Sequence, residues 1–430
     1  MGEGVLTSGF TRTESGLACE GVPLERVARE VGTPAYVYSS AMVRDRFVRL
    51  DEALTGVSHR IHYTLKANSN AGLLRLLKEL GAGVDVVSGG ELYRALRLGF
   101  TGDDIVFGGV GKTDRELREA VQAGVKLVNA ESLAEVRALN RIAGEEGTTA
   151  RVGLRVNPEV TVDSSHRYIK TGERGAKFGI PFDEVLEVAR IAASLPNVAL
   201  HGLDMHIGSQ LFRIDPYVDG VERLTGLLDA IRAEGVDTLK YLDIGGGLGV
   251  SYSDEVSPDL GRFAKALVKR VVPTGLTLLM EPGRFIVGNA AVLLTRVLYR
   301  KHSGGKDYVV ADAGMTELLR PSHYGAYHRI LAVHERSGAS TVDVVGPVCE
   351  SGDFLALDRE LDDVQPGDHL LVCDVGAYGF AMASNYNSRL RPVEVLVDGD
   401  AYAVITTREE YGDLSRLEIA HPEWKRERGT

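Results

Sequence analysis

Hydrophobic residues between positions 61 and 281 follow two alternating spacings. Short runs in which apolar residues alternate with polar ones, or follow one another directly, predict β-strands. Longer stretches with apolar residues three and four positions apart lie between these runs and predict helices. The predicted strands are eight in number, at 61–66, 84–88, 105–109, 126–129, 152–156, 200–207, 241–245 and 277–281.

The alternation of strands and helices implies parallel βαβ units and therefore an α/β fold. Eight such units, which need roughly 200 residues or more, are sufficient for a closed (β/α)8 barrel. An open, doubly wound sheet is the competing arrangement. We favour the barrel because polar residues gather at the carboxyl end of nearly every predicted strand, where the active sites of such barrels lie.

The pattern changes after residue 284, where helical periods fade and turns rich in Gly, Pro and Asp separate strand-like runs. We expect a mostly β domain, sandwich-like or barrel-like, over residues 285–430, and the barrel over residues 36–284. Residues 1–35 are too short for a domain and are expected to pack with the β domain. The additional strands are predicted at 34–38, 292–299, 308–311, 340–345, 368–373, 391–397 and 401–406, with a small helix at 24–31.

The composition and charge indicate which kinds of protein this sequence can encode. A hydrophobic content of 44% and a charged content of 25% are typical of a globular protein with a full core. The net charge of −11, without any basic run, argues against a nucleic-acid partner. No signal peptide or membrane-spanning run is recognisable. Three widely separated cysteines, Cys19, Cys349 and Cys373, favour a reducing cytoplasm and offer no metal-binding pair.

Lys66 stands at the end of the first predicted strand, just before a predicted helix at 71–80. A lysine held there among apolar side chains would favour its neutral, nucleophilic form. The alternative is an ordinary solvated lysine at the end of a strand. The residues that follow the other strands favour the first interpretation.

Several later strands also carry polar residues in or next to their carboxyl-terminal halves: Asp85, Ser88, Arg155, Asn157, Asp204, His206, Asp243 and Glu281. Three glycines, 245–247, follow the seventh strand, and consecutive glycines let backbone N–H groups converge on a phosphate. Their spacing differs from that of the dinucleotide fingerprint and of the P-loop. The alternative for this run is a flexible turn.

His206 is either a core histidine or a residue that contacts a ligand. His201 and His206 are five residues apart and point to opposite faces of one strand, so they cannot share a metal ion, and we expect no metal site. A flat imidazole is suited to stack on an aromatic ring, and the Glu281 carboxylate is suited to keep a ring nitrogen protonated. With Lys66 and the glycine run, these features describe a site for pyridoxal 5′-phosphate.

The chain resembles the barrel-type pyridoxal-phosphate-dependent amino-acid decarboxylases, and among them most closely the diaminopimelate decarboxylase family. Family motifs occur in the family's order over nearly the whole chain. They are YTLKAN (63–68), HIGSQ (206–210), GGG (245–247), EPGR (281–284), RPSHYGAYH (320–328), CESGD (349–353) and GAYG (376–379). Residues 157–166 follow the family only loosely, whereas 168–172 and 177–179 are regular.

The resemblance implies roles for the matched residues. Those expected to bind the cofactor are Lys66, which would be linked to it covalently, Asp85, His206, Ser209, Gly246, Gly247, Glu281 and Tyr378. Those expected to bind substrate are Arg284, Arg320, Tyr324, Glu350 and Tyr378. Lys66, His206, Glu281 and Cys349 would take part in catalysis, with Cys349 donating a proton after carbon dioxide leaves. One of the arginines could instead serve the cofactor phosphate.

The reaction implied by the resemblance is the decarboxylation of meso-2,6-diaminopimelate to L-lysine and carbon dioxide, the last step of lysine biosynthesis. The resemblance also implies a cytoplasmic homodimer in which the Cys349–Glu350 segment enters the neighbouring subunit's site. Decarboxylases of lysine, ornithine or a polyamine precursor are the nearest alternative. An amino-acid racemase is disfavoured by Glu281, because such racemases commonly have an arginine at the ring nitrogen. A non-catalytic homologue is disfavoured because the chain keeps Lys66, Cys349 and the arginines.

Overall fold

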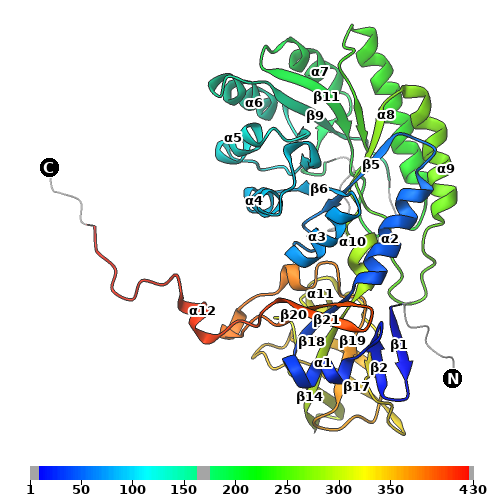
Figure 1. Cartoon of the computed structure of the whole chain (residues 1–430), viewed down its shortest axis with the longest axis vertical. Coiled ribbons are helices and arrows are strands. Elements are labelled where there is room, and N and C mark those ends of the chain that lie inside the picture. Colours follow the sequence, from blue (N-terminus) through cyan, green and yellow to red (C-terminus); the bar gives the residue numbers. More distant parts are fainter. Residues whose placement is uncertain (1–8, 162–174, 426–430) are drawn as a thin grey trace.

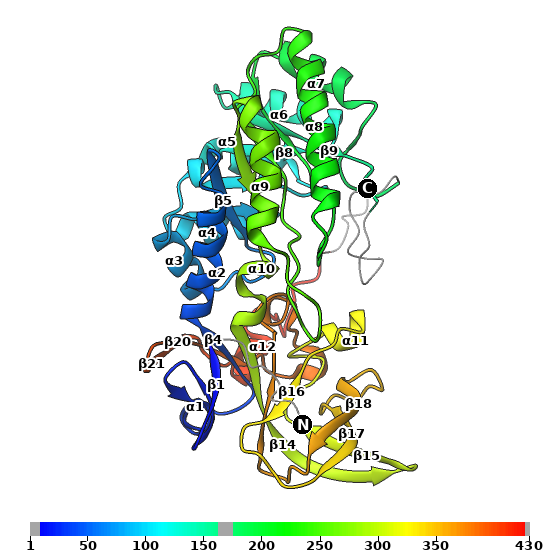
Figure 2. The same cartoon turned by 90° about the vertical axis from the view of Figure 1, so that its right-hand side faces the viewer.

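The fold is described from a computed structural model, which covers residues 9–161 and 175–425. Figure 1 shows two parts stacked along the long axis, a barrel ringed by helices above and a β domain below. Figure 2, turned by 90°, shows the same two layers. The site described below lies where they meet.

The barrel consists of parallel strands in a closed ring, which confirms the barrel and excludes the open sheet. The strand order is β9-β11-β12-β13-β5-β6-β7-β8, and β8 pairs with β9 to close the ring. The bounds are β5 (His59–Thr64), β6 (Gly83–Val86), β7 (Ile105–Phe107), β8 (Leu127–Ala130), β9 (Ala150–Asn157), β11 (Val198–Asp204), β12 (Tyr241–Asp243) and β13 (Thr277–Met280). A short β10 (Ile180–Pro181) pairs in parallel with the end of β9.

Most helices around the barrel begin where a polar side chain satisfies the free N–H groups of the first turn. Asn70, Ser88, Thr113, Ser132 and Asp259 each accept such a hydrogen bond. The helices are α3 (Ala71–Glu79), α4 (Gly89–Arg97), α5 (Asp114–Ala123), α6 (Leu133–Glu145), α7 (Val185–Ser194), α8 (Asp215–Ala233) and α9 (Leu260–Val271). Their apolar faces pack on the strands and make the main core.

The second sheet is organised around β14 (Ala291–Ser303), which pairs with β15 (Lys306–Ala311), β19 (His369–Val372) and β4 (Ala35–Ser39). The sheet order is β18-β17-β15-β14-β4-β20-β21, and β16 pairs with β19. The remaining strands are β16 (Ile330–Ala332), β17 (Ala339–Val345), β18 (Phe354–Asp362), β20 (Val393–Asp398) and β21 (Ala401–Thr406).

Two of these strands were not predicted from the sequence. β16 has three residues, too few to show a period. β18 contains the charged run 358–360 and pairs irregularly with β17, and its Asp358 has a φ of 46°, so the apolar alternation is broken. Both strands therefore depend on tertiary pairing rather than on local pattern.

The N-terminal segment joins the β domain, as expected. A small sheet of β1 (Phe10–Thr13), β2 (Gly16–Cys19) and β3 (Val22–Pro23) precedes α1 (Leu24–Val31). β4 then pairs with β14 and with β20, so the chain up to Ser39 belongs to the second sheet. The expected boundary at residue 36 therefore cuts through β4, and the chain enters the barrel with α2 (Ser40–Ala53).

A buried hydrogen-bond network joins the barrel to the second sheet. The Tyr38 hydroxyl donates to Glu394 Oε1 at 2.7 Å, and Asn70 Nδ2 donates to Glu394 Oε2 at 2.7 Å. Asn68 Nδ2 donates to the Tyr38 hydroxyl oxygen at 3.0 Å. Glu394 is 1% exposed. The network fixes the chain just after Lys66, at the start of α3.

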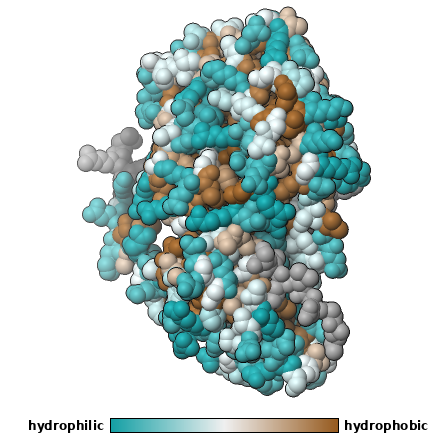
Figure 3. All heavy atoms as spheres, turned by 45° about the vertical axis from the view of Figure 1, so that its right-hand side comes forward, coloured by the Kyte–Doolittle hydropathy of each residue, from teal (hydrophilic) through white to brown (hydrophobic). Residues whose placement is uncertain are grey.

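The face drawn in Figure 3 is mainly hydrophilic, with hydrophobic residues in scattered patches. Within residues 9–161 and 175–425, no helix combines the length and the apolar character that crossing a membrane requires.

Tyr38→Phe tests the network that joins the two parts. The change leaves a buried Glu394 oxygen without its donor, so we expect the free energy of unfolding to fall by about 1–3 kcal/mol. Urea denaturation measures this. Tyr402→Phe is the matched control, because the Tyr402 hydroxyl donates to Glu30 at the surface, and it should cost less than about 0.5 kcal/mol. Equal losses in the two variants would contradict the assignment.

Candidate active site

A cavity of about 390 Å³ lies between the carboxyl end of the barrel and the β domain. It brings together seven of the residues predicted for the site: Lys66, His206, Ser209, Arg284, Arg320, Tyr324 and Tyr378. The first three follow barrel strands, whereas the last three come from α11 (Arg320–Tyr324) and from the loop after β19. Neither part of the molecule forms this cavity alone.

Lys66 lies two residues beyond β5 with its Nζ 3.5 Å from Asp85 Oδ2. Its side chain is 36% exposed, while Asp85 is buried. Burial lowers the pKa of Lys66, but the nearby Asp85, with Tyr378 and Glu281, outweighs it, and the pKa lies above its usual value. The expectation of an apolar setting that favours the neutral amine is therefore wrong: the surroundings are acidic and stabilise the ammonium.

His206 is half-buried, lines the cavity with Lys66 and contacts the glycine loop. Its Nδ1 accepts a hydrogen bond from the Gly246 N–H at 3.2 Å. Burial, with the positive charges of Lys66 and Arg155, holds the pKa of His206 well below its usual value. The ring is therefore neutral, and because Nδ1 is an acceptor, its proton is on Nε2.

The glycine run 245–247 is a fixed loop, which excludes the flexible-turn alternative. A Cβ on Gly246 would lie 2.2 Å from the Glu281 carbonyl oxygen, and one on Gly247, whose φ is 104°, would lie 2.3 Å from the Gly208 carbonyl oxygen. The Tyr217 hydroxyl donates to the Gly246 carbonyl oxygen at 2.8 Å. Only glycine allows the backbone to approach so closely at these two positions.

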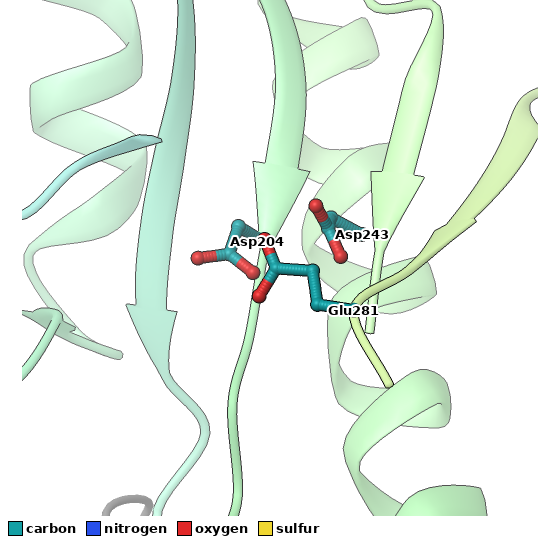
Figure 4. Close-up of side chains that lie close together, drawn as sticks. All are labelled: Asp204, Asp243 and Glu281. Carbon is teal, nitrogen blue, oxygen red and sulfur yellow. The ribbon is translucent and has the colours of Figure 1, made fainter. Parts of the chain in front are cut away.

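Glu281 belongs to a cluster of three buried carboxyl groups at the ends of adjacent strands (Figure 4). One oxygen each from Asp204, Asp243 and Glu281 lies within 4.8 Å of the others, a spacing that a metal ion could also use. The guanidinium of Arg155 lies 3.8 Å from Asp204 and already balances part of the charge. Burial, then the nearby Asp243 and Asp85, raises the pKa of Glu281 well above its usual value.

Two arginines form the opposite wall. Arg284 donates from Nη1 to the Tyr252 hydroxyl oxygen at 2.7 Å and from Nη2 to Ser209 Oγ at 3.3 Å. Its guanidinium lies 4.9 Å from the centre of the Tyr378 ring. Since Ser209 and Tyr378 are expected at the cofactor phosphate, these contacts support the alternative in which Arg284 serves that phosphate.

Arg320 is also buried, with its guanidinium 4.8 Å from the centre of the Tyr252 ring. Its Nη1 donates to His328 Nε2 at 3.0 Å, and His328 Nδ1 donates to the Cys373 carbonyl oxygen at 2.8 Å. Burial and the charge of Arg320 lower the pKa of His328 to about 3, so this ring is a neutral acceptor. His328 therefore fixes the position of the Arg320 guanidinium and leaves its positive charge unpaired by that contact.

Cys349 and Glu350 do not line this cavity among the described residues. Both are exposed, in the loop between β17 and β18, where the Cys349 N–H donates to Asn387 Oδ1 at 3.1 Å. Their expected place in the active site of a neighbouring subunit stays a prediction.

Several residues around the cavity were not assigned a role from the sequence. Tyr252 and Glu255 line it from the loop 244–259, and Gln210 joins that loop by donating to the Val250 carbonyl oxygen at 2.7 Å. The length of this loop at the carboxyl end of the barrel was the available indication, since such loops carry function. His328 lies in a quoted motif, but its contact with Arg320 follows only from the fold.

The loosely matching segment lies partly outside the described residues, which omit 162–174, including 168–172. After this gap, the Gly179 N–H donates to Glu131 Oε2 at 2.7 Å, and the Phe178 ring lies 4.9 Å from the Arg155 guanidinium. Residues 178 and 179 therefore pack against charged residues at the ends of β8 and β9.

Gly247→Ala tests the glycine loop. The added Cβ must displace the backbone at Gly208, so we expect the affinity for pyridoxal phosphate to fall at least about tenfold, equivalent to ~1.4 kcal/mol. Fluorescence titration of the cofactor-free protein measures it. The control is Gly226→Ala in α8, where a Cβ meets no atom within 4 Å and affinity should not change. An unchanged affinity in Gly247→Ala would show that the loop does not approach the cofactor closely.

Comparison with known proteins identifies the family of this chain. Residues 40–288 match the family described as "Pyridoxal-dependent decarboxylase, pyridoxal binding domain". A diaminopimelate decarboxylase of Vibrio cholerae is 46% identical over 417 residues, covering 96% of this chain and 99% of the relative. The diaminopimelate decarboxylase of Helicobacter pylori, solved with L-lysine, aligns with a TM-score of 0.89 at 39% identity, covering 92% of this chain and 99% of that one. The diaminopimelate decarboxylase of M. jannaschii, also solved with L-lysine, aligns with a TM-score of 0.91 at 34% identity. The alignment covers 97% of this chain and 99% of that one. The chain belongs to the diaminopimelate decarboxylase family of pyridoxal-dependent decarboxylases.

Proposed function

We propose that this protein uses pyridoxal 5′-phosphate to decarboxylate meso-2,6-diaminopimelate, releasing carbon dioxide and L-lysine as the last step of lysine biosynthesis. The observation that carries the proposal is one cavity that joins Lys66 to two buried arginines. Relatives named for this activity cover nearly the whole chain, and two of the similar structures contain L-lysine. Three cysteines without disulfides support a cytoplasmic location.

The residues of the cavity fit the cofactor. The glycine loop provides a cradle that any Cβ would fill, and Ser209 and Tyr378 lie at the same end through their contacts with Arg284. His206 presents a neutral ring and Glu281 a buried carboxyl group. We assign the phosphate to Ser209, Gly246, Gly247 and Tyr378, the face of the ring to His206, and the ring nitrogen to Glu281. When bound, pyridoxal phosphate supplies an acceptor for the electron pair that remains after carbon dioxide leaves.

Lys66 is the attachment point for the cofactor, and it must lose a proton first. Its raised pKa keeps Nζ protonated at neutral pH. Asp85 Oδ2, 3.5 Å away, is the acceptor positioned to take that proton. We therefore assign Asp85 to proton movement at Lys66 rather than to direct recognition of the cofactor.

The arginine side of the cavity is where we place the substrate. Diaminopimelate carries a second amino-acid group at its far end, whereas lysine ends there in a bare ammonium. A fixed guanidinium matches the far carboxylate, and Tyr324 adds a hydroxyl. Arg320, held by a neutral histidine, is the better candidate for this contact, because Arg284 is engaged beside Ser209. Decarboxylation then takes place at the D-configured centre, as in the family.

We further propose that the protein is a homodimer with shared sites. The support is the exposure of Cys349 and Glu350 outside the cavity of their own chain. In the neighbouring site, Glu350 would receive the far ammonium of the substrate. Cys349 would donate the proton that replaces carbon dioxide at the reacting carbon.

Carbon dioxide release from meso-diaminopimelate and from lysine tests the reaction and its specificity. We expect strong preference for diaminopimelate, because an unmatched buried arginine penalises lysine, and no release by Lys66→Ala. Arg320→Met should reduce kcat/KM for diaminopimelate by ~1.5–3 kcal/mol, the range of a charge-assisted hydrogen bond, and much less for lysine. The control is Arg336→Met, at a surface pair with Asp368. Comparable activity on both substrates, or an unaffected Arg320→Met, would contradict the specificity.

Mixing inactive variants tests the shared sites. Mixed dimers of Lys66→Ala and Cys349→Ala would contain one site with both defects and one with neither, so activity should recover to about a quarter of the wild-type value. The control mixture is Lys66→Ala with Glu281→Gln. Both of these defects lie in the barrel, so every site stays defective. Subunit exchange without recovery in the first mixture would refute sharing.

A further inference from the structure

The two oxygens of Asp243 have different surroundings. Asp243 is the last residue of β12 and is completely buried. Its Oδ1 accepts a hydrogen bond from the Gly245 N–H at 3.0 Å. Its Oδ2 has no hydrogen-bond partner among the described residues. The first oxygen therefore holds the glycine loop, and the second requires an explanation, because an unsatisfied buried acceptor is costly.

Gly245 is held from both sides. While its N–H binds Asp243, its carbonyl oxygen accepts a hydrogen bond from the Glu281 N–H at 2.8 Å. The loop glycine is thus fixed between the residue that ends β12 and the residue that follows β13. Gly246 comes next and contacts His206. A displacement of Asp243 would move the loop, Glu281 and His206 together.

The carboxyl groups of Asp243, Glu281 and Asp204 lie close together, and Figure 4 shows the three side chains converging from neighbouring strand ends. One oxygen of Asp243 and one of Glu281 lie within 4.8 Å of each other, and Glu281 and Asn129 both lower the pKa of Asp243. Two ionised carboxylates can only accept hydrogen bonds, so neither could satisfy the other. One proton between them makes one group a donor and removes the repulsion of two like charges.

The charges around this pair favour keeping the proton. Facing it are Asp85 and Asp204, the cations Lys66 and Arg155, and the neutral Asn129. Arg155 also binds Glu131 at 2.8 Å, so its charge is shared. Burial raises the pKa of Asp243 to about 6, although the hydrogen bond from the Gly245 N–H lowers it. The nearby Asp85 adds to the increase. With Asp243 and Glu281 both ionised, four carboxylates would face two cations, so a bound proton lowers the electrostatic free energy.

We propose that Asp243 is a positioning residue for the cofactor: its Oδ1 fixes the glycine loop, and its Oδ2 shares one proton with Glu281. The inference rests on the proposed function in placing the cofactor phosphate at the loop and the ring nitrogen at Glu281. One side chain then sets the spacing between the two ends of the cofactor site. It also keeps the Glu281 carboxyl group oriented before the ring arrives.

The first experiment separates the two functions of Asp243 by titrating cofactor-free, full-length protein with pyridoxal phosphate. Asp243→Ala removes both contacts and should weaken binding at least about tenfold. Asp243→Asn keeps an oxygen for the Gly245 N–H and gives Glu281 an N–H donor, so binding should stay within about threefold of wild type. Asp204→Ala is the matched control, because it removes an equally buried carboxyl group that does not touch the loop. Equal weakening by Asp243→Ala and Asp204→Ala would overturn the positioning role.

The second experiment detects the proton. Infrared difference spectra between wild type and variant, recorded near neutral pH on the cofactor-free protein, show the carbonyl stretch of any protonated carboxyl group that a variant removes. Asp243→Asn and Glu281→Gln should each remove the same band, and the double variant should remove no second one. Asp204→Asn should leave that band in place. Two separate bands, or no band lost in either single variant, would refute the shared proton.

Neither readout depends on turnover. A protein that binds pyridoxal phosphate and shows the shared band, but releases no carbon dioxide from diaminopimelate, would refute the proposed reaction and leave Asp243 in its role. A protein that releases carbon dioxide but lacks the band, or whose cofactor binding tolerates Asp243→Ala, would refute the role of Asp243 and leave the proposed reaction standing. A wild-type protein that does not bind pyridoxal phosphate at all would refute both.

Discussion

The constraint on which the site depends is the burial of several carboxyl groups at one end of a closed barrel. Strand ends that meet in a ring bring Asp85, Asp204, Asp243 and Glu281 together away from water. Such a group of charges is tolerated only with cations or protons beside it. The site uses both, since Lys66 is held as an ammonium and the pKa of Glu281 is raised well above its usual value. Lys66 and Glu281, which should bind the two reactive parts of the cofactor, therefore both owe their protonation states to the same group of buried charges.

The second domain completes this site rather than merely accompanying it. The Tyr378 N–H donates to the Ala67 carbonyl oxygen at 2.8 Å, which ties the β domain to the residue after Lys66. The long strand β14 supports both β4 and β19, so the chain that precedes the barrel and the loop that carries Tyr378 belong to one sheet. This arrangement explains why Arg320 can face Lys66 although they come from different domains.

The sequence predicted the barrel and the composition of the cavity well, because both rest on local order. Each strand has its own apolar run, and in a parallel barrel every strand end points to the same rim, so Lys66 and His206 had to be close. It could not predict features that depend on tertiary contacts. The acidic setting of Lys66 arises from Asp85 and Glu281 on other strands. The pairing of β18, the contact of His328 with Arg320 and the boundary at Ser39 likewise follow from partners distant in the chain.

We propose above all that Glu281 would keep the ring nitrogen of bound pyridoxal phosphate protonated. Steady-state kinetics of Glu281→Gln on meso-diaminopimelate test it most directly, because the amide cannot supply the negative charge. We expect kcat to fall by more than about tenfold with a smaller change in KM, since the charge matters most in the transition state. Cofactor content, measured by absorbance, should stay near the wild-type level. A kcat within about a factor of two of wild type, less than ~0.5 kcal/mol on the rate scale, would contradict the account.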